Sequence, residues 1–574
     1  MDMINVKING RDYSVPAEST VLEACRYAGI DIPTLCYLKD INQIGACRLC
    51  LVEVVGARGL VTACVYPANE GMEILTNTAK VQAARKTNIE LVLSAHEKKC
   101  LSCIRSTNCE LQKFANDFGA DADYFKGAAP EKAIDTSTAF LVRDNNKCIL
   151  CRRCVGACEH QGIGAIGAVN RGFDTEIAPA FDKTLSETSC ISCGQCIVAC
   201  PVGALYEKDD TARVFEALSD PTKHVAICTA PSVRATLGEC FGYEPGTDVE
   251  GKMAAALRRL GFYDMNFTAD LTIIEEAHEF IERVQNGGKL PLITSCSPGW
   301  VKFCEHYFPE MTENLSTCKS PQQMFGALYK TYFAKKMGID PKDIVFVSAI
   351  PCTAKKFEVG RPGQDVDGMP GVDVAITTRE LARMIQSAGI NFRGLKDEGF
   401  DQPFDVASGA GAIFGATGGV MEAALRTAAE TILGTKLEKL EFEDVRGIEP
   451  IKRASYKLGD LTVRVAVTSG TANAKNLLRA VQDGTEQVDF IEVMACPGGC
   501  VNGGGQPVQD ATVRSTTDLK SLRAAVLYHD DDTSELRKSH ENPACIKVYE
   551  EFLEEPGSHI AHEILHTHYI KRGL

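Results

Sequence analysis

The sequence lacks the features that would place it in a membrane or outside the cell. None of its apolar runs approaches the roughly 18 residues that a membrane-spanning helix needs. The first residues carry neither the charged-then-apolar pattern of a secretory leader nor a twin-arginine start. A net charge of −15 argues against non-specific binding to nucleic acid or to acidic membranes. We therefore expect a cytoplasmic protein with no membrane and no nucleic-acid partner.

Cysteine, in contrast, is plentiful. The 574 residues include 25 cysteines, and many stand in C-x2-C groups within the first 200 residues. A disulfide-rich secreted scaffold would need an export signal, which we do not find. C-x2-C spacing is typical of metal binding, so we expect a reduced metalloprotein. The length, with 45% apolar residues, predicts several domains that have real hydrophobic cores.

Hydrophobic patterns predict an α+β front part followed by a larger α/β part. Near the N-terminus, Asn9-Gly10 joins two alternating strands, and Ser19 is expected to cap a helix that runs to Ala28. Residues 81–126 are predicted to be helical, and residues 127–212 hold two similar repeats. From about residue 213, strands alternate with amphipathic helices, which predicts βαβ units around largely parallel sheets. Examples are strands at 224–227, 290–293 and 344–350, and helices at 251–260 and 378–388; a further strand, at 51–55, is predicted in the front part.

The two repeats each carry a C-x2-C-x2-C-x3-C run. This is the signature of two-cluster bacterial ferredoxins, in which the fourth cysteine of each run ligates the other 4Fe–4S cluster. Zinc is the weaker alternative, because it would require isolated tetrahedral pairs. The predicted ligands are Cys148, Cys151, Cys154 and Cys200 for one cluster, and Cys190, Cys193, Cys196 and Cys158 for the other.

Two more ligand sets precede these repeats. The first resembles a plant-type 2Fe–2S site with a longer first gap. The second has the form H-x3-C-x2-C-x5-C and resembles the His-ligated 4Fe–4S cluster of hydrogenases and of the large respiratory-complex subunit. Zinc is the alternative for both sets. They consist of Cys36, Cys47, Cys50 and Cys64, and of His96, Cys100, Cys103 and Cys109. Four clusters in a row predict an electron-transfer chain with a redox site at one end and a partner at the other.

Three isolated cysteine segments stand out in the last part of the chain. Thr294–Trp300 reads TSCSPGW and contains the only tryptophan, and Ile350–Lys356 reads IPCTAKK. Both follow apolar strands. The third segment, Glu492–Gly505, reads EVMACPGGCVNGGG. Cysteines at strand ends with glycine-rich neighbours can converge on one buried site, although a buried structural cysteine remains the alternative for each segment singly.

These segments resemble the three active-site signatures of FeFe (iron-only) hydrogenases: T-S-C-C-P-x-W, M-P-C-x-x-K-x-x-E and E-x-M-A-C-x-x-G-C. Together with the cluster motifs, the resemblance covers essentially the whole chain, in the monomeric clostridial arrangement with four accessory clusters. It implies an H-cluster, in which a 4Fe–4S cubane is joined through one thiolate to a diiron subsite with CO, cyanide and a bridging dithiolate. It also implies four domains: a β-grasp 2Fe–2S ferredoxin-like domain at 1–80, a small helical His/Cys3 4Fe–4S domain at 81–126, a two-cluster ferredoxin-like domain at 127–212 and a large α/β catalytic domain at 213–574.

The resemblance also assigns roles around the H-cluster. Cys352, Cys496 and Cys500 would hold the cubane, Cys500 would bridge to the diiron subsite, and Lys355 would hydrogen-bond a cyanide. The pocket lining would include Pro231, Ser232, Gln322, Phe414 and Met494.

The chain departs from the family pattern at two positions. Where the first signature has two adjacent cysteines, this chain has Cys296-Ser297. Cys296 keeps the place of the proton-transferring thiol, and Ser297 takes the place of a cubane ligand. Three options stay open: a serine alkoxide ligates iron, the loop shifts so that Cys296 becomes the ligand, or the site is an engineered or variant one. Ile350 replaces the usual methionine, a change that we expect to be tolerated.

A predicted helix over 272–283 places Glu276, Glu279 and Arg283 on one face. A solvated charged stripe is the ordinary interpretation of such a face. By position, however, these residues match the proton route of the family, with Ser316 between the two glutamates. The route would run from Cys296 through Glu276, Ser316 and Glu279 to Arg283. Carboxylates suit this role because partial burial brings their pKa towards the working pH.

Two weaker motifs are set aside. His562–His566 matches the H-E-x-x-H pattern of zinc proteases, but it lies too near the C-terminus for a later domain to complete a cleft, so we expect a surface helix. Gly409–Gly419 is glycine-rich without the G-x-G-x-x-G spacing of a dinucleotide loop.

The resemblance implies ferredoxin hydrogenase activity, that is, reversible reduction of protons to H2. The electron partner would be ferredoxin or flavodoxin, dedicated maturation proteins would insert the diiron subsite, and the protein would be a monomer. Ser297 favours an alternative, a catalytically weak or non-catalytic relative such as a redox or H2 sensor or an assembly factor. An electron-transfer subunit of a respiratory or formate dehydrogenase would explain residues 1–210 but not the three later signatures.

Overall fold

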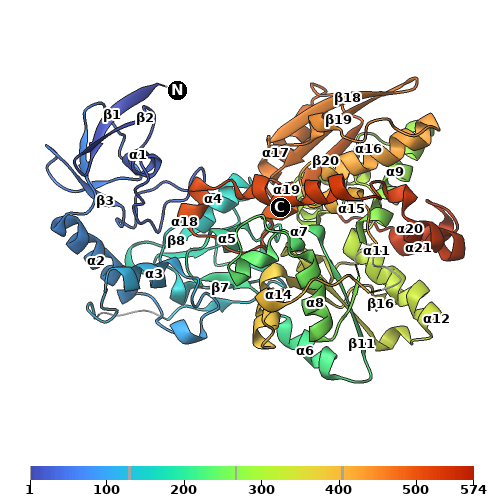
Figure 1. Ribbon diagram of the computed structural model, residues 1–574, viewed down its shortest axis with the longest axis horizontal. Coiled ribbons are helices and arrows are strands. Elements are labelled where there is room, and N and C mark those ends of the chain that lie inside the picture. The colour runs from blue at the N-terminus through green and yellow to red at the C-terminus, as the bar shows by residue number, and fades with distance from the viewer. Residues whose placement is uncertain (1, 127–130, 266–267, 402–405, 574) are drawn as a thin grey trace. The chain divides into compact units, whose positions relative to one another are not determined.

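The computed structural model describes residues 2–126, 131–265, 268–401 and 406–573. Its internal contacts divide the chain into two compact units. Unit 1 comprises residues 1–188, 195–206 and 508–518, and unit 2 comprises residues 189–194, 207–507 and 519–574. Both units mix sheets and helices (Figure 1), in agreement with the predicted α+β class. The four domain boundaries proposed from the sequence stay predictions.

Unit 1 begins with a five-stranded mixed sheet in the order β2-β1-β5-β3-β4. The predicted hairpin is confirmed: β1 pairs antiparallel with β2, and Asn9 and Gly10 both adopt positive φ, as a two-residue hairpin turn requires. Helix α1 starts after Thr20, which forms a capping box with Glu23, so the predicted cap at Ser19 is wrong by one residue. These elements are β1 (Met3–Ile8), β2 (Arg11–Pro16), α1 (Val21–Tyr27), β3 (Leu51–Val54), β4 (Val61–Thr62) and β5 (Glu73–Leu75).

The rest of unit 1 consists of short elements around cysteine-bearing loops. One small sheet has the order β10-β7-β6, and β8 pairs antiparallel with β9. Helix α18 comes from far along the chain, yet it packs here, because Ala511 shares an apolar cluster with Leu38, Ala157 and Ala199. The elements are α2 (Ala79–Ser94), α3 (Glu110–Asp117), β6 (Ile134–Asp135), β7 (Leu141–Asp144), α4 (Arg153–His160), β8 (Gly167–Val169), β9 (Glu176–Ala178), α5 (Gln195–Ala199), β10 (Leu205–Glu207) and α18 (Ala511–Thr516).

Unit 2 contains an all-parallel sheet in the order β12-β11-β14-β17. Its strands are β11 (His224–Thr229), β12 (Tyr263–Met265), β14 (Ile344–Ile350) and β17 (Val374–Thr377). Successive residues of β11 enter different apolar cores: Val225 and Ile227 join one, and Ala226 and Cys228 join the other. Both faces of this sheet are therefore covered, which explains why its strands are continuous apolar runs.

The second sheet of unit 2 has the order β13-β20-β19-β18. The pairs β13–β20 and β19–β20 are parallel, and β18–β19 is antiparallel. The sheet packs against α9 and α16 through a core that includes Phe280, Met421 and Phe490. Its strands are β13 (Leu292–Ile293), β18 (Ile451–Leu458), β19 (Leu461–Ser469) and β20 (Phe490–Met494); β15 (Asp365–Val366) and β16 (Met369–Pro370) form a separate hairpin.

The helices of unit 2 include the two amphipathic helices expected from the sequence, found as α8 and α14. Among the described residues, the α-helices of unit 2 are α6 (Thr211–Ser219), α7 (Pro231–Arg234), α8 (Glu250–Leu260), α9 (Thr268–Gln285), α10 (Pro298–Tyr307), α11 (Pro321–Leu328), α12 (Ala334–Met337), α13 (Ala354–Glu358), α14 (Thr378–Ser387), α15 (Gly409–Ile413), α16 (Gly419–Leu433), α17 (Thr471–Gln482), α19 (Leu519–Thr533), α20 (Pro543–Val548) and α21 (His559–Leu565). Within the described residues, no helix is both long and apolar enough to span a bilayer.

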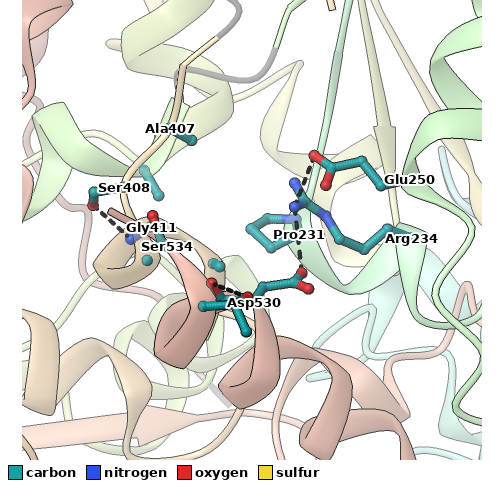
Figure 2. Close-up of a pocket in the computed structure, with 12 residues that line it drawn as sticks. Pro231, Arg234, Glu250, Ala407, Ser408, Gly411, Asp530 and Ser534 are labelled. Carbon is teal, nitrogen blue, oxygen red and sulfur yellow. Dashed lines mark hydrogen bonds and ion pairs between the residues drawn. The ribbon is translucent and has the colours of Figure 1, made fainter. Parts of the chain in front are cut away.

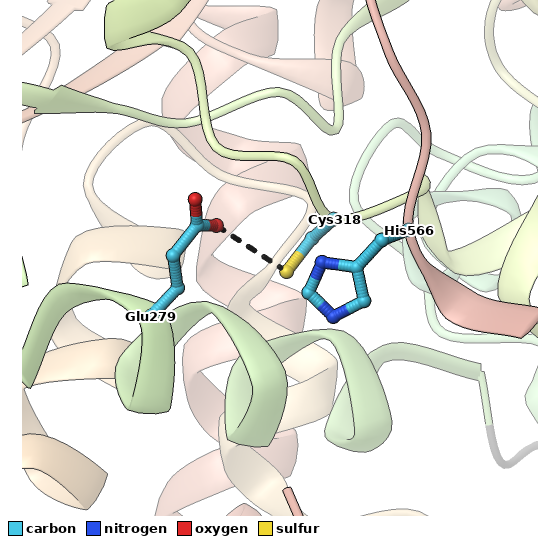
Figure 3. Close-up of side chains that lie close together, drawn as sticks. All are labelled: Glu279, Cys318 and His566. Carbon is cyan, nitrogen blue, oxygen red and sulfur yellow. Dashed lines mark hydrogen bonds between the residues drawn. The ribbon is translucent and has the colours of Figure 1, made fainter. Parts of the chain in front are cut away.

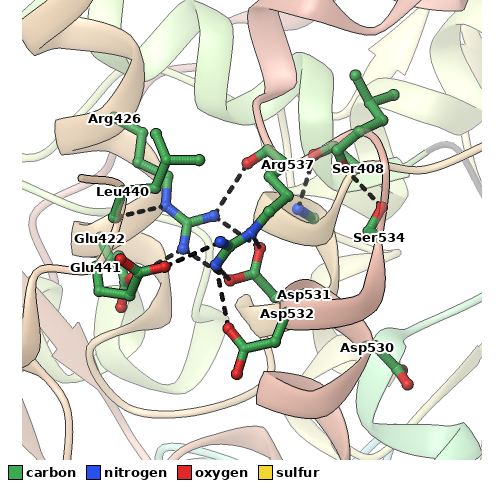
Figure 4. A network of polar contacts seen from close by, with 12 residues as sticks. Ser408, Glu422, Arg426, Leu440, Glu441, Asp530, Asp531, Asp532, Ser534 and Arg537 are labelled. Atoms are coloured by element: carbon green, nitrogen blue, oxygen red, sulfur yellow. Dashed lines mark hydrogen bonds and ion pairs between the residues drawn. The ribbon is translucent and has the colours of Figure 1, made fainter. Parts of the chain in front are cut away.

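A buried ionic network ties α16 to α19 in unit 2 (Figure 4). Arg426, whose side chain is fully buried, donates two hydrogen bonds of 2.7 Å to the Asp531 carboxylate and one of 2.8 Å to Glu422. Arg537 binds Asp531, and Arg446 binds Glu422. Because each buried charge meets an opposite one, the network can hold these two helices together without leaving an unpaired ion.

Candidate functional site

The candidate site lies where four parallel strands of unit 2 end. β11 leads into Ala230-Pro231-Ser232, β13 into the segment with Cys296, β14 into the segment with Cys352, and β20 into Cys496. Two of these strands belong to one sheet and two to the other. In open α/β sheets, the loops beyond the carboxyl ends of strands are where ligands bind. The topology therefore brings the three cysteine segments to one place.

These loops enclose one small, mostly apolar cavity of about 80 Å³. Cys228, for which the motifs predict no ligand role, contributes to its wall. Cys496 is buried on the same loop as Cys500 but is not among the lining residues. Most of the H-cluster residues singled out from the sequence do line the cavity: Pro231, Ser232, Cys296, Ser297, Gln322, Cys352, Lys355, Phe414, Met494 and Cys500.

The cysteine thiols in this cavity lie in a strongly desolvating environment. Burial, together with the charge of a neighbouring Cys352 thiolate, raises the pKa of Cys500 to about 12, and burial also raises the pKa of Cys352. Burial and the nearby carboxylate of Glu276 raise the pKa of Cys296 well above its usual value, although Lys355 opposes the shift. Cys352 and Cys500 are therefore held as neutral thiols unless a cation or metal cluster stabilises their thiolates, which is the behaviour expected of metal ligands.

Ser297 faces the third cysteine segment. Its Oγ accepts a hydrogen bond of 3.4 Å from the backbone N–H of Ala495, the residue before Cys496. It is also the N-cap residue of α10, but its side chain makes no capping hydrogen bond. The hydroxyl is thus turned to the cysteine segments and lines the cavity instead of serving its own helix.

Glu358 is a functional residue that the sequence reasoning missed. Its Oε2 accepts hydrogen bonds from Lys355 Nζ at 3.0 Å and from Gln322 Nε2 at 2.6 Å, and Ser320 Oγ donates to it at 2.8 Å. Lys355 Nζ also donates to the backbone oxygen of Cys296 at 3.0 Å. One buried carboxylate therefore orients two of the side chains that line the cavity. The sequence did hold a signal for Glu358, because it lies three residues after Lys355, at the glutamate position of the second signature.

Glu492 plays a similar role for the third segment. Its carboxylate accepts hydrogen bonds of 2.7 Å from the backbone N–H groups of Gly418 and Met421, at the start of α16. Burial raises the pKa of Glu492. The bonds fix the end of β20, and with it Met494, against the loop after Phe414. Gly418 has a φ of 96°, and a side chain there would collide with the backbone oxygen of Val445, so only glycine fits.

The predicted proton-route residues lie close together in unit 2. Ser316 Oγ donates to Glu279 Oε2 at 2.7 Å, and Arg283 binds Glu279 Oε1 at 2.6 Å. Glu276 is buried, and neither of its carboxylate oxygens has a hydrogen-bond partner within the described residues. Burial and the charge of Glu279 raise the pKa of Glu276 to about 8, partly opposed by Ser316. A carboxyl group with this pKa can both hold and release a proton near neutral pH.

A larger cavity of about 260 Å³ lies next to the first one, and the two share the lining residues Pro231 and Ala269 (Figure 2). Its charged wall is formed by Arg234, which binds Glu250 at 2.8 Å and Asp530 at 3.4 Å. Burial raises the pKa of Asp530 to about 6, although Arg234 opposes the shift. The narrow site cavity thus adjoins a wider polar one.

In unit 1, one of the predicted cluster sites is a recognisable cavity. A space of about 20 Å³ is lined by Cys148, Cys151, Cys154 and Cys200. These are the first three cysteines of the first run and the fourth cysteine of the second run, as the two-cluster motif predicts. Cys158 and Cys196 belong to unit 1, whereas Cys190 and Cys193 belong to unit 2, so the ligand set of the other cluster stays a prediction.

The thiols of the predicted 2Fe–2S site are grouped within unit 1. Cys47 and Cys64 lie within hydrogen-bond reach of Cys36 and lower the pKa of Cys36. Cys64 likewise lowers the pKa of Cys50. The four predicted ligands of this set therefore lie together, as binding to one cluster requires.

The His96 set also belongs to unit 1. The Nδ1 atom of His96 is buried and has no hydrogen-bond partner within the described part of the chain. Burial lowers the pKa of His96, which keeps the imidazole neutral as metal ligation requires. The sulfur of Cys103 lies close to Gly203, and a side chain at position 203 would come within 2.6 Å of that sulfur. Glycine at 203 therefore leaves room for this thiol.

The loop that carries Cys190 and Cys193 packs against the candidate site inside unit 2. Thr353 Oγ1, next to Cys352, donates a hydrogen bond of 2.8 Å to the backbone oxygen of Ser192. A side chain at Gly504 would come within 2.2 Å of the Cys193 backbone oxygen, so this approach requires glycine. The second ferredoxin-type cysteine run therefore begins beside the cavity.

Five family models match successive parts of the chain. The C-terminal domain of the iron-only hydrogenase large subunit matches residues 223–504, and the iron hydrogenase small subunit matches residues 517–572. The others are a 2Fe–2S iron–sulfur cluster binding domain at 1–79, the NADH-ubiquinone oxidoreductase-G iron–sulfur binding region at 85–123 and a 4Fe–4S dicluster domain at 147–206. Iron hydrogenase 1 of Clostridium pasteurianum is 45% identical over 99% of this chain and 100% of its own length. The chain belongs to the iron-only (FeFe) hydrogenase family.

Two further comparisons agree with this FeFe hydrogenase assignment. The NADP-reducing hydrogenase subunit HndD of Solidesulfovibrio fructosivorans is 49% identical over the full length of both chains. A solved structure of a variant of the FeFe hydrogenase HydA1 from Chlamydomonas reinhardtii has a TM-score of 0.57 and 40% identity, and it covers 64% of this chain and 100% of that one. The predicted family and multidomain fold are thus confirmed.

Proposed function

We propose that this FeFe hydrogenase reversibly reduces two protons to H2 with two electrons, at an H-cluster bound in the 80 Å³ cavity. The observation that carries the proposal is the convergence of all three signature segments on that cavity. The residues there fit the group: buried neutral thiols that need a metal to ionise, an ammonium group at Lys355 for an anionic ligand, and a mostly apolar wall.

The ligands in this proposal are Cys352, Cys496 and Cys500, with Ser297 in the fourth place. When bound, the H-cluster supplies the electrons and the metal site at which hydrogen is formed or split. The chain itself positions the cluster, and Glu358 holds Lys355 towards the cavity. Gln506, which donates to the backbone oxygen of Cys500 at 3.1 Å, fixes the loop that would bridge to the diiron subsite.

Proton movement is the chain's second task. Cys296 lines the cavity, and Glu276 is near enough to affect its pKa. From Glu276, the Ser316 hydroxyl leads to Glu279 and then to Arg283, which donates to backbone oxygens at the surface side of the route. Ser316 and Glu279 are already hydrogen-bonded, and the permanently charged Arg283 holds Glu279 in place. Glu276 has no hydrogen-bond partner within the described residues, so proton transfer to and from it requires a movement of its side chain or a water molecule.

Electron supply is the task of the accessory clusters. We propose one 2Fe–2S cluster and three 4Fe–4S clusters, held by the ligand sets predicted from the sequence. The loop of Cys190 and Cys193 beside Gly504 supports delivery of electrons to the cavity. Iron and acid-labile sulfide analysis, with EPR of the reduced protein, would count the clusters. Zinc in place of iron at the His96 set would contradict this part.

The proposed electron partner is ferredoxin or flavodoxin, and the protein is proposed to be a cytoplasmic monomer. The name of the HndD relative offers another possibility, in which electrons reach NADP through partner subunits. Steady-state assays with reduced ferredoxin, reduced flavodoxin and NADPH, each as the only electron donor, distinguish these two possible electron partners. Activity with NADPH alone would contradict direct ferredoxin coupling, and light scattering would measure the mass.

The test of the main proposal uses protein co-produced with the maturation proteins that insert the diiron subsite. We expect H2 evolution from reduced methyl viologen and infrared bands of CO and cyanide ligands. If fully matured protein shows neither, the proposal is wrong. If the infrared bands appear but turnover is very slow, the second candidate is favoured: a sensor or assembly relative whose cubane is weakened by Ser297.

A further inference from the structure

The H-E-x-x-H pattern near the C-terminus has no role in the function proposed so far. In the structure, residues 562–565 of this pattern form the end of α21, and His566 is the residue after the helix. The pattern does not form the cleft of a zinc protease. His562 is exposed, and His566 follows one turn later with a side chain that is only 6% exposed. The two imidazole rings lie close together, with 4.1 Å between their centroids. One ring therefore lies at the surface and its partner lies beneath it.

The inner ring contacts the proposed proton route. His566 Nδ1 is 2.8 Å from Thr317 Oγ1, and Thr317 Oγ1 is 3.4 Å from Glu279 Oε1. The backbone N–H of Thr317 also donates to Glu279 Oε2 at 3.0 Å, which keeps the hydroxyl beside that carboxylate. Figure 3 shows the imidazole and the carboxylate on the two sides of Cys318. A continuous line of groups that exchange protons thus runs from Glu279 to His566.

We propose that His566 and His562 form a second proton branch, which joins Glu279 to solvent independently of Arg283. The inference rests on the proposed function, because Glu279 passes protons only if the cavity consumes or releases them. During H2 formation, the His566 imidazolium gives its Nδ1 proton to Thr317 Oγ1, while Thr317 gives its own hydroxyl proton to the Glu279 carboxylate. The Nδ1 atom of His566 then turns away from Thr317 and takes up a proton from solvent on the side of the exposed His562 ring, whose centroid is 4.1 Å away. H2 oxidation reverses the order, and no other reactant is needed.

The charges around His566 suit this role. From α9, Glu275 Oε2 lies 3.1 Å from His566 Nε2. Glu275 is itself held by the Tyr549 hydroxyl at 2.5 Å and by the backbone N–H of Gly557 at 3.1 Å. A carboxylate in this position stabilises the imidazolium and fixes the orientation of the ring. Among the described residues, other ionisable groups near the two rings are Glu279 and Glu282 of α9 and the Cys318 thiol.

A divalent cation could also use this place, because ligand atoms of Glu279, Cys318 and His566 all lie within 4.8 Å of one another. However, both ring nitrogens of His566 already have partners, Thr317 at one and Glu275 at the other. A metal ion would have to displace one of these contacts for as long as it stays bound, whereas a proton relay keeps the Glu275 contact and opens the Thr317 contact only between transfers. The geometry therefore favours proton transfer.

The first test is kinetic and uses matured holoenzyme. His566→Gln keeps polar contacts available to Thr317 and Glu275 but cannot carry a proton. Because two branches operate in parallel, H566Q alone should cause a small loss of H2 evolution. In an Arg283→Gln background, the same change should lower the rate by roughly tenfold, with a larger solvent deuterium isotope effect. His562→Gln should act in the same direction and tests the branch at a surface position where folding is not at risk.

The matched control is His559→Gln, which removes an exposed histidine from the same helix and should leave the rate and pH profile unchanged. Added imidazole should partly restore the His566→Gly variant in the Arg283→Gln background. If H566Q and H562Q match their parents in both backgrounds, the branch is wrong. That result differs from failure of the proposed function, in which the wild-type protein would lack both H2 evolution and the infrared bands.

A second test does not depend on turnover. Hydrogen–deuterium exchange at the imidazole C2 position, followed by mass spectrometry, reports on individual histidines. Glu279→Gln removes a negative charge near Thr317 and His566, so the C2 exchange of His566 should change while that of His559 stays the same. Unchanged C2 exchange at His566 would show that the two residues are not coupled, and it would overturn the branch even in protein without an H-cluster.

Discussion

Lys355 and Glu358 form a buried ion pair, 3.0 Å from Nζ to Oε2, on one turn of α13 beside the candidate cavity. Glu358→Gln keeps the shape of the side chain and removes its charge. Lys355 and Gln322 would then lose the charged acceptor that orients both of them, so we expect H2 evolution to fall by about 10–100-fold. The cyanide infrared bands of matured protein should shift as well, because Lys355 is proposed to contact that ligand.

The adjacent pair Lys356–Glu380 provides the matched control for this change. Lys356 Nζ binds Glu380 Oε1 at 2.8 Å, and both side chains are buried, but neither lines the cavity. Glu380→Gln should therefore lower the melting temperature without moving the cyanide bands. If both variants alter the spectrum equally, the effect of Glu358 is general destabilisation and its positioning role is contradicted.

Glu276 should set the alkaline limit of H2 evolution. Its pKa of about 8 means that the carboxyl group carries a proton at neutral pH and loses it as the pH rises through 8. The wild-type rate should therefore decline above that pH. Glu276→Gln, which cannot exchange a proton, should lower the rate by about 10²-fold or more at all pH values. Glu282→Gln, an exposed neighbour on α9, is the control that should behave as wild type.

Stability gives an independent check on the same group. Between the ordinary value of 4.5 and about 8, the folded chain keeps a proton on Glu276 that the unfolded chain releases. Stability is therefore lost as the pH rises across this window. Glu276→Gln removes that loss, so its melting temperature should rise relative to wild type from pH 5 to pH 8. A constant difference across this range would show that the carboxyl group titrates normally.

Ser297 decides how firmly the proposed cubane is held. A serine alkoxide is a harder and far more basic ligand than a cysteine thiolate. Ser297→Cys should raise the iron content of the matured protein and increase H2 evolution by about tenfold or more. Iron analysis and infrared spectra of the two proteins, prepared side by side, measure this. Equal spectra and rates would mean that position 297 is not a deciding ligand.

Arg426 should be required for stability and not for chemistry. Arg426→Met would leave Asp531 and Glu422 with fewer positive partners in a buried place (Figure 4). We expect a loss of about 3–5 kcal/mol in unfolding free energy. The control is Lys439→Met, which breaks an exposed pair with Glu443 and should leave the unfolding free energy almost unchanged. Denaturant titration measures both, and similar losses would contradict the role of the buried network.

Much of the fold and the site could be predicted, because the features that determine them are local. C-x2-C spacing, the Asn9-Gly10 turn and the apolar strands before Cys296 and Cys352 all follow from short-range chemistry. The site positions came from three signatures that are also short. Their meeting at one cavity was implied by the resemblance, because the spacing along the chain says nothing about which strands are neighbours.

What could not be predicted depends on contacts between distant residues. Ser19 and Thr20 are both able to cap α1, and the choice of Thr20 depends on its capping box with Glu23. The role of Glu358 depends on Gln322, which reaches it from another helix. His566 was expected on a surface helix, but its side chain is buried against Thr317, a residue far away in the sequence.

The path of the chain also bears on how the protein is made. Helix α18 completes unit 1, where Arg514 donates to the backbone oxygen of Val198 at 2.8 Å and Arg26 donates to Ser515 at 2.9 Å. The ribosome must therefore synthesise the chain to residue 518 before unit 1 has all its parts. A shortened gene that stops after the cysteine repeats would leave Leu38 and Ala157 without their partner Ala511. The electron-transfer modules should thus be harder to express alone than their N-terminal position suggests.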